Sequence, residues 1–423
     1  MDKQFTIEYA RELDKSDKLK SFRNEFYIED PDLVYLDGNS LGRMPKKALE
    51  KIEHEVRHRW GERLVRSWSE GWMELTQKVG AKIALLIGAK ADEVIIADSV
   101  SVNLFKLVMA SLLSVNPERN TIITDELNFP SDLYILEGVV KVLGGKHKIK
   151  IIESEDGLTI SQENIEKKLN DKVALLVLTA TAFKSGFNYD LAAVTELAHK
   201  YGALILLDLC HTVGALPVDL GVCKADLAVG CTYKYLNGGP GSPAFLYVRK
   251  DLQEKLMNPI FGWFGHNAQF NFDTNYYPAE CIKRFLTGTP PIPLIVSVET
   301  GVDLILKAGI DNLRVKSTSQ GEYFIKLYDY FLKPMGVSLN SPRDCKIRGS
   351  HISLGHPEGY RIDQALIKEM GVIPDFRAPD NIRFGITPLY TTYEEIFKAI
   401  TSFKDVLKNK IYEKYSEARE LVT

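Results

Sequence analysis

Several features that would place this chain in a membrane, on nucleic acid or in an oxidising compartment are missing from its sequence. No apolar run approaches the length of a membrane span, and residues 1–20 lack the apolar core of a signal peptide. The 423 residues carry a net charge of −3, so no basic excess favours nucleic acid. The five cysteines are odd in number and show no C-x-x-C spacing, as expected of reduced thiols. We therefore expect a cytoplasmic protein in which local groups bind any anionic ligand.

Strand-like and helix-like segments alternate through the middle of the chain. Residues 173–181 (VALLVLTAT) form a continuous apolar run, as expected of a parallel strand covered on both faces. Residues 191–202 follow with an apolar face at helical spacing and end at a glycine, which suits a helix C-terminus. Further strand-like runs occupy residues 92–99, 120–130, 203–214, 226–235 and 244–250. This alternation predicts an α/β fold with a mostly parallel sheet.

The C-terminal part of the chain has a different pattern, which predicts a second domain. Apolar residues at helical spacing mark a helix around residues 324–331, residues 348–356 are strand-like, and residues 381–403 pass from a strand through a turn into a helix. We expect a large ligand-binding domain, a smaller α/β domain and an N-terminal segment that joins the smaller one, at residues 51–304, 305–423 and 1–50.

Polar residues gather where the strand-like runs end. Open α/β sheets bind ligands at the carboxyl ends of their strands, so these residues should lie near one another. They are Ser99, Ser101, residues 129–132 (FPSD), Thr179, Asp208, His211, Tyr233 and Lys234. Lys234 is unusual because a flexible, strongly hydrated ammonium rarely sits between two buried strands.

This set of residues suits pyridoxal phosphate. That cofactor needs an amine for a Schiff base, a carboxylate beside its pyridinium nitrogen, an aromatic face and a phosphate cup. Lys234, Asp208 and Phe129 match the first three needs, and Ser101 with Tyr233 matches the fourth. Taken singly, Asp208 also fits a strand-end cap, Phe129 a core residue and Lys234 a solvated side chain. Their occurrence together in one sheet favours the cofactor.

Short motifs spread over nearly the whole chain carry a resemblance to a known family. They are YLDGNSLG (35–42), RSW (66–68), SVNLFK (101–106), FPSD (129–132), DLCHTVGALPVDL (208–220), YKYLNGGPGS (233–242), GWFGH (262–266), TGTPP (287–291) and IRFG with PLY (382–390). In this order they resemble kynureninase, a pyridoxal-phosphate enzyme of the aspartate-aminotransferase fold, or fold type I. The resemblance implies hydrolytic cleavage of the Cβ–Cγ bond of L-kynurenine to anthranilate and L-alanine, in tryptophan and kynurenine metabolism.

The resemblance also assigns the catalytic and cofactor-binding residues. Lys234 would hold the cofactor covalently and later move protons, Asp208 would keep the pyridinium protonated, and Tyr233 would donate protons. The cofactor would lie among Val100, Ser101, Phe129, Pro130, Ser131, Asp132, Thr179, Asp208, His211, Tyr233 and Lys234.

Other roles implied by the resemblance lie further from Lys234. Arg383 would pair with the substrate carboxylate, Ser40 would contact the substrate, and Trp68 would line the pocket of the aryl ring. Trp263 and Thr289 would reach the phosphate of the partner subunit. The resemblance therefore implies a homodimer with shared active sites and a small-molecule substrate. We expect no bound metal.

Two positions depart from what the resemblance leads us to expect. Residues 182–186 read AFKSG where many bacterial relatives have a run like Asn-Tyr-Arg-Thr-Gly, so Ala182 removes a polar group expected near the cofactor or substrate. Trp68 stands where animal relatives have a histidine. An indole there favours kynurenine over 3-hydroxykynurenine.

Two other functions also have some support in the sequence. Residues 54–58 (HEVRH) match the H-E-x-x-H zinc signature on a predicted helix, but the arginines and glutamates around them are typical of a solvated helix face. A cysteine desulfurase or selenocysteine lyase would need a reactive cysteine on a loop, for which Cys345 is the candidate. Those enzymes usually stack a histidine on the cofactor ring, where this chain offers Phe129.

Overall fold

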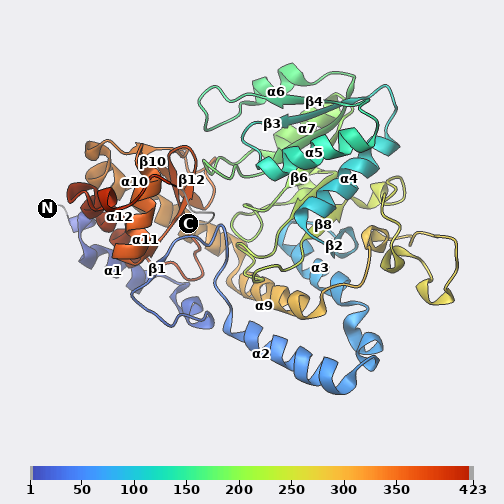
Figure 1. The fold of residues 1–423 in the computed structure, drawn as a ribbon, viewed down its shortest axis with the longest axis horizontal. Helices are drawn as coiled ribbons and strands as arrows, with labels where there is room; N and C mark the ends of the chain where they lie inside the picture. Colours follow the sequence, from blue (N-terminus) through green and yellow to red (C-terminus); the bar gives the residue numbers. More distant parts are fainter. Residues whose placement is uncertain (1–2, 419–423) are drawn as a thin grey trace.

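A seven-stranded sheet forms the centre of the large domain in the computed structural model, which describes residues 3–418 (Figure 1). The strand order is β2–β8–β7–β6–β5–β3–β4, and every neighbouring pair is parallel except the two pairs that β8 makes. The strands are β2 (Val94–Ile96), β3 (Thr121–Asp125), β4 (Lys148–Ile152), β5 (Val173–Thr179), β6 (Leu204–Asp208), β7 (Leu227–Gly230) and β8 (Phe245–Val248). This arrangement confirms the predicted α/β class.

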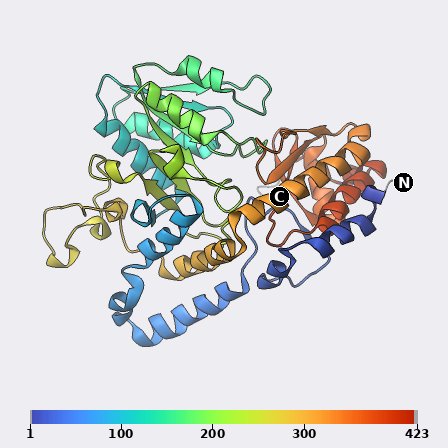
Figure 2. The same ribbon diagram turned by 180° about the vertical axis from the view of Figure 1, so that it is seen from behind.

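Helices cover both faces of this sheet, as Figures 1 and 2 show. Successive residues of β5 therefore enter different cores: Leu175 and Val177 pack in one, and Leu176 and Leu178 pack in the other. This burial on both faces is why the strand is a continuous apolar run. The helices of the large domain are α3 (Leu75–Leu86), α4 (Val100–Ser114), α5 (Pro130–Val142), α6 (Gln162–Lys168), α7 (Leu191–Lys200), α8 (Leu220–Cys223) and α9 (Ile292–Ala308).

The small domain has its own four-stranded antiparallel sheet, in the order β12–β13–β10–β9. A separate core cluster lies between this sheet and its helices. The elements are α10 (Ile310–Phe331), β9 (Ser338–Leu339), β10 (His351–Gly355), α11 (Gly359–Met370), β11 (Val372–Ile373), β12 (Asp375–Arg377), β13 (Asn381–Gly385) and α12 (Tyr393–Lys408). The boundary predicted after residue 304 falls inside α9, and α9 meets α10 at Gly309, whose φ of 79° ends the helix.

The N-terminal segment packs on the small domain. Helix α1 (Ile7–Ser16) lies against α12, where the Asp14 carboxylate accepts the backbone N–H groups of Tyr393 (2.8 Å) and Glu394 (2.9 Å) in the first turn of α12. Strand β1 (Val34–Tyr35) pairs in parallel with β11. The chain then continues through α2 (Lys46–His54) to the large domain.

The segments that differ from their expected structure include the strand at residues 92–99 and the helix around residues 54–58. The run at residues 92–99 is a strand only as far as Ile96, because Asp98 adopts a left-handed φ of 41° and Ser99 then caps α4. After α2 the chain continues as a π-helical stretch, Glu55–Arg63.

Within residues 3–418, no helix is long and apolar enough to cross a membrane.

Candidate active site

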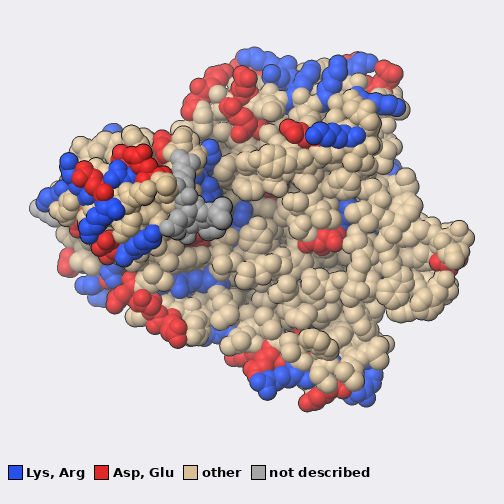
Figure 3. All heavy atoms as spheres, viewed as in Figure 1, with Lys and Arg blue, Asp and Glu red and all other residues tan. Residues whose placement is uncertain are grey.

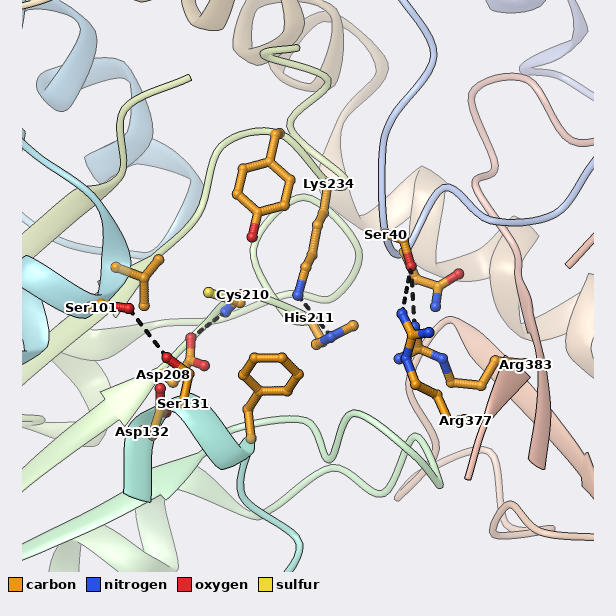
Figure 4. A pocket seen from close by; sticks show the side chains of 14 residues that line it. Ser40, Ser101, Ser131, Asp132, Asp208, Cys210, His211, Lys234, Arg377 and Arg383 are labelled. Atoms are coloured by element: carbon orange, nitrogen blue, oxygen red, sulfur yellow. Dashed lines mark hydrogen bonds between the residues drawn. The ribbon is translucent and has the colours of Figure 1, made fainter. Parts of the chain in front are cut away.

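A cavity of about 310 Å³ lies at the carboxyl ends of the central strands, where the two domains and the N-terminal segment meet (Figure 4). Its walls come from the N-termini of α4 and α5, the loops after β6 and β7, strands β12 and β13, and the loop after β1. The lining residues are Asn39, Ser40, Val100, Ser101, Phe129, Ser131, Asp132, Asp208, Cys210, His211, Tyr233, Lys234, Arg377 and Arg383.

Lys234 projects into this cavity from the loop after β7. Its Nζ lies 2.9 Å from Nε2 of His211 and 5.9 Å above the ring of Phe129. Burial, together with the charge of Lys234, lowers the pKa of His211 well below its usual value, so the imidazole is neutral and can accept a hydrogen bond from the amine. Gly42 makes the loop possible, because a Cβ at that position would lie 2.3 Å from the Lys234 carbonyl oxygen.

Two buried carboxylates face the cavity from the opposite side. Asp208 ends β6, and its Oδ1 accepts the backbone N–H of Cys210 at 2.7 Å. Burial raises the pKa of Asp208, and the charge of Lys234 opposes this shift. Asp132 lies in the first turn of α5, where burial and Asp208 raise its pKa well above the usual value and its Oδ2 has no hydrogen-bond partner. A cationic ring N–H beside these oxygens would satisfy both the charge and the open acceptor, so the site fits a pyridinium.

The N-termini of α4 and α5 meet at the rim of the cavity. Ser101 Oγ of α4 lies 3.2 Å from Ser131 Oγ of α5, and Ser99 caps α4. Free backbone N–H groups and hydroxyls at helix N-termini are a ready site for a phosphate. Tyr233 also lines the cavity, and its neighbour Cys231, together with burial, raises the pKa of its phenol, which keeps the proton on the oxygen. The donor set thus fits both ends of pyridoxal phosphate.

The far wall of the cavity carries two guanidinium groups that share one carboxylate. Arg383 is buried, and Asp375 accepts a hydrogen bond from its Nε at 2.7 Å and another from Nη2. Its Nη1 donates to the Phe183 carbonyl at 2.6 Å and its Nη2 to Ser40 Oγ at 3.1 Å. Arg377 Nη2 lies 2.6 Å from Asp375 Oδ2, and its side chain is 35% exposed. Burial opposes ionisation of Asp375, but Arg383 outweighs it and lowers the pKa, so the cluster has a net positive charge suited to an anion.

Most predicted site residues come together in the cavity, but five do not line it. Thr179 is buried at the end of β5 beside Asp208, with its hydroxyl donating to the Thr181 carbonyl, and Pro130 begins α5 next to the cavity. The other three belong to segments that contribute nothing to the cavity wall: Trp68, Trp263 and Thr289.

Three residues that line the cavity were not predicted from the sequence: Asn39, Cys210 and Arg377. A usable signal existed for Arg377, which stands in the same short segment as Arg383, six positions before it, on the neighbouring strand of an antiparallel pair. Asn39 sits in the YLDGNSLG motif but ends no strand of the central sheet. Ala182 is buried in the core, and its neighbour Phe183 holds Arg383 through a backbone carbonyl, so the AFKSG run supports the arginine cluster.

The structure does not support a zinc site at HEVRH. The rings of His54 and His58 are 5.2 Å apart, but His58 pairs with Glu62 at 2.7 Å and Glu55 accepts the indole N–H of Trp72 at 2.9 Å. Nowhere in the described part of the chain do three His, Cys, Asp or Glu side chains group as a metal site would require. Cys345, the candidate for a desulfurase cysteine, does not line the cavity. The cysteine that does line it is Cys210.

Residues 313–403 match a family model described as the kynureninase C-terminal domain. Kynureninase from Pseudomonas fluorescens is 41% identical over 404 residues, covering 95% of each chain. Kynureninase from Burkholderia mallei (strain SAVP1) is 39% identical over 411 residues, covering 96% of this chain and 97% of the relative.

Solved structures with the same fold are more distant in sequence. The apo structure of cysteine desulfurase from Thermococcus onnurineus NA1 has a TM-score of 0.77 and 20% identity, and covers 92% of this chain and 98% of its own. The cystine C–S lyase C-DES in complex with cysteine persulfide has a TM-score of 0.78 and 17% identity, and covers 89% of this chain and 98% of its own. At this identity they show the fold alone.

Proposed function

The chain belongs to the kynureninase family, and we propose that the cavity around Lys234 is where it hydrolyses the Cβ–Cγ bond of L-kynurenine with pyridoxal phosphate as cofactor. The observation that carries this assignment is the placement of Lys234 Nζ above the Phe129 ring, between the two buried carboxylates and the arginine cluster. The direct test is the appearance of anthranilate fluorescence when L-kynurenine is added to the purified protein. A protein that carries the cofactor but releases no anthranilate would contradict the proposal.

Different residues of the cavity have different roles in this reaction. When bound, pyridoxal phosphate supplies an electron sink for the negative charge that develops on the substrate carbons. Lys234 would hold the cofactor covalently through its amine and would take the α-proton of the substrate, while neutral His211 accepts a hydrogen bond from that amine. Asp208 and Asp132 would stabilise a protonated ring nitrogen, because among the residues that the structure describes both buried carboxyl groups lack a paired cation on the side that faces the cavity.

The substrate is held at its other end. The arginine cluster receives the carboxylate, with Arg383 fixed by Asp375 and Arg377 open to the cavity. Water adds to the γ-carbonyl, and the Cβ–Cγ bond breaks so that the γ-carbon leaves as the carboxyl group of anthranilate. The β-carbon takes up a proton and the α-carbon regains the one it lost, which gives alanine. Tyr233, whose phenol stays protonated, is the proposed donor of that proton.

We also propose that the protein works as a homodimer in the cytoplasm. All five cysteines are free thiols, as in a reducing compartment. The face seen in Figure 3 has a broad uncharged region beside the loop of residues 257–278, which extends from the large domain in Figure 1. Exposed apolar side chains on that loop are Met257, Phe261, Trp263, Phe270, Phe272 and Tyr277. A patch rich in exposed aromatics suits a protein interface, and a second copy would bring Trp263 and Thr289 to a neighbouring cavity.

Mixed dimers test the shared site. Lys234→Ala and the double variant Trp263→Ala/Thr289→Ala should each be nearly inactive. In a mixed dimer one cavity would combine intact Lys234 with intact Trp263 and Thr289, so random exchange should restore roughly a quarter of the sites. Refolding the mixture with cofactor and measuring anthranilate gives the answer. A tag that proves subunit exchange, without recovered activity, would rule out the shared site.

Trp68 is the proposed determinant of aryl preference. It does not line the cavity of its own chain; it packs against Trp72 (5.3 Å between ring centroids) and Phe264 (5.8 Å), next to Trp263. We therefore place it with the residues contributed across the interface. Trp68→His should raise the ratio of kcat/KM for 3-hydroxykynurenine over kynurenine about tenfold, because a polar partner discriminates a hydroxyl. Trp72→His is the control, and an equal shift in both variants would remove Trp68 from the pocket.

A further inference from the structure

A lysine on the inner face of α4 is completely buried. The side chain of Lys106 has no exposed surface, and its Nζ donates to Asp98 Oδ2 at 2.7 Å and to the Phe285 carbonyl at 2.7 Å. Burying an ammonium is strongly unfavourable unless it is paired and hydrogen-bonded, and a hydrophobic side chain would fill the same space more cheaply. A gain in stability therefore does not explain a lysine at this position. Its two hydrogen bonds instead fix the segment of Asp98 relative to the segment of Phe285.

The first of these segments is the start of α4. Asp98 lies between β2 and Ser99, the N-cap of the helix. Its φ of 41° turns the chain sharply into the N-terminus of α4, which is part of the proposed phosphate site. The turn is held on three sides: the Asp98 backbone carbonyl accepts the N–H of Ala244 at 2.8 Å, Oδ2 accepts Lys106, and Oδ1 accepts the hydroxyl of Thr287 at 2.9 Å.

The second segment is the loop that carries Thr289. Thr287 stands two positions before it, and its carbonyl accepts the N–H of Phe264 at 3.0 Å. The segment around Trp263 crosses Thr287 so closely that a Cβ on Gly262 would lie 2.3 Å from the Thr287 carbonyl oxygen. Thr287 therefore contacts the backbone of the Trp263 segment directly and lies two residues from Thr289.

We propose that Lys106, Asp98 and Thr287 form a positioning chain that sets the N-terminus of α4 relative to the loop bearing Trp263 and Thr289. The proposal rests on the proposed function, in which α4 receives the phosphate of its own subunit and the loop reaches the phosphate of the partner. The chain would then couple the two phosphate sites of the dimer and act on phosphate recognition alone, because none of its three side chains lines the cavity.

Two ligands that differ only in the phosphate group test this role. The dissociation constants of pyridoxal and of pyridoxal phosphate are measured by visible absorption on the full chain freed of cofactor. The constant of pyridoxal divided by that of pyridoxal phosphate gives the contribution of the phosphate. Thr287→Val should reduce this ratio about tenfold, the usual effect of losing a hydrogen bond to a charged group, and leave pyridoxal binding within about twofold. Thr287→Ser keeps the hydroxyl and should restore the ratio.

A matched lysine separates positioning from stability. Lys316 is also buried, and its Nζ donates to Asp17 at 2.7 Å and to the Pro388 carbonyl at 2.6 Å in the small domain. Lys106→Met and Lys316→Met should both alter the melting temperature, but only Lys106→Met should reduce the phosphate contribution. The positioning role would be overturned if Thr287→Val weakened the binding of pyridoxal phosphate and of pyridoxal equally. It would also be overturned if Lys316→Met reduced the ratio of the two dissociation constants.

The double variant Trp263→Ala/Thr289→Ala distinguishes this proposal from the shared site. If the double variant lowers the contribution of the phosphate while Thr287→Val does not, the positioning chain is wrong and the shared site stands. If neither variant lowers that contribution, the positioning chain and the shared site are both wrong. A reduction in Thr287→Val alone would also overturn the chain as proposed, because the loop would then have no contact with phosphate to position.

Discussion

Replacing Lys234 by alanine should lower kcat by at least about 10³-fold, because the variant loses both the amine that binds the cofactor and the base that moves the α-proton. The visible absorption of the bound cofactor should change at the same time, since no covalent link can form. Anthranilate fluorescence measures the first effect and an absorption spectrum the second.

The fold should survive this change, because the Lys234 amine contacts His211, and no buried carboxylate among residues 3–418 accepts a hydrogen bond from it. Lys184 is a matched control, since its Nζ lies 5.9 Å above the ring of Phe183, as that of Lys234 lies 5.9 Å above Phe129. Lys184→Ala should retain activity. Activity near that of the unmodified protein in Lys234→Ala would exclude the mechanism.

The part of the site that the sequence predicted best is the part built on the central sheet. Lys234, Asp208 and Ser101 follow apolar runs, and the carboxyl ends of parallel strands must converge, so linear order was enough to bring these residues together. The same reasoning predicted the fold class, because a strand such as β5, covered on both faces, leaves an unbroken apolar run.

The remainder of the site depends on contacts that linear order does not encode. Asn39 and Arg377 reach the cavity only because the N-terminal segment and the small domain pack at the strand ends. The pairing of Asp375 with Arg383 follows from the antiparallel register of β12 and β13, in which these two residues are directly opposite. Trp263 and Thr289 do not line the cavity of their own chain, and the role proposed for them involves a second chain, which the order of residues in one chain does not describe.

Replacing Arg383 by alanine should raise KM for L-kynurenine by roughly 30- to 1000-fold, the effect of a bidentate charged partner worth about 2–4 kcal/mol. In the free protein its Nε and Nη2 pair with Asp375, so only the edge formed by Nη1 and Nη2, now held by the Phe183 carbonyl and Ser40, can turn to the substrate. Steady-state kinetics at varied L-kynurenine measure this, and kcat should change much less than KM.

Two further variants identify which group receives the carboxylate. Arg383→Lys keeps the charge but loses the planar fork, so it should recover only part of the affinity. Arg377→Ala should raise KM less than Arg383→Ala, because Arg377 is 35% exposed and its charge is better screened by solvent. Removing Arg383 also leaves Asp375 buried with a single arginine, so each melting temperature must be measured beside the kinetics. If Arg377→Ala raises KM strongly while Arg383→Ala leaves it unchanged, the carboxylate binds at Arg377, and Arg383 serves only to hold Asp375.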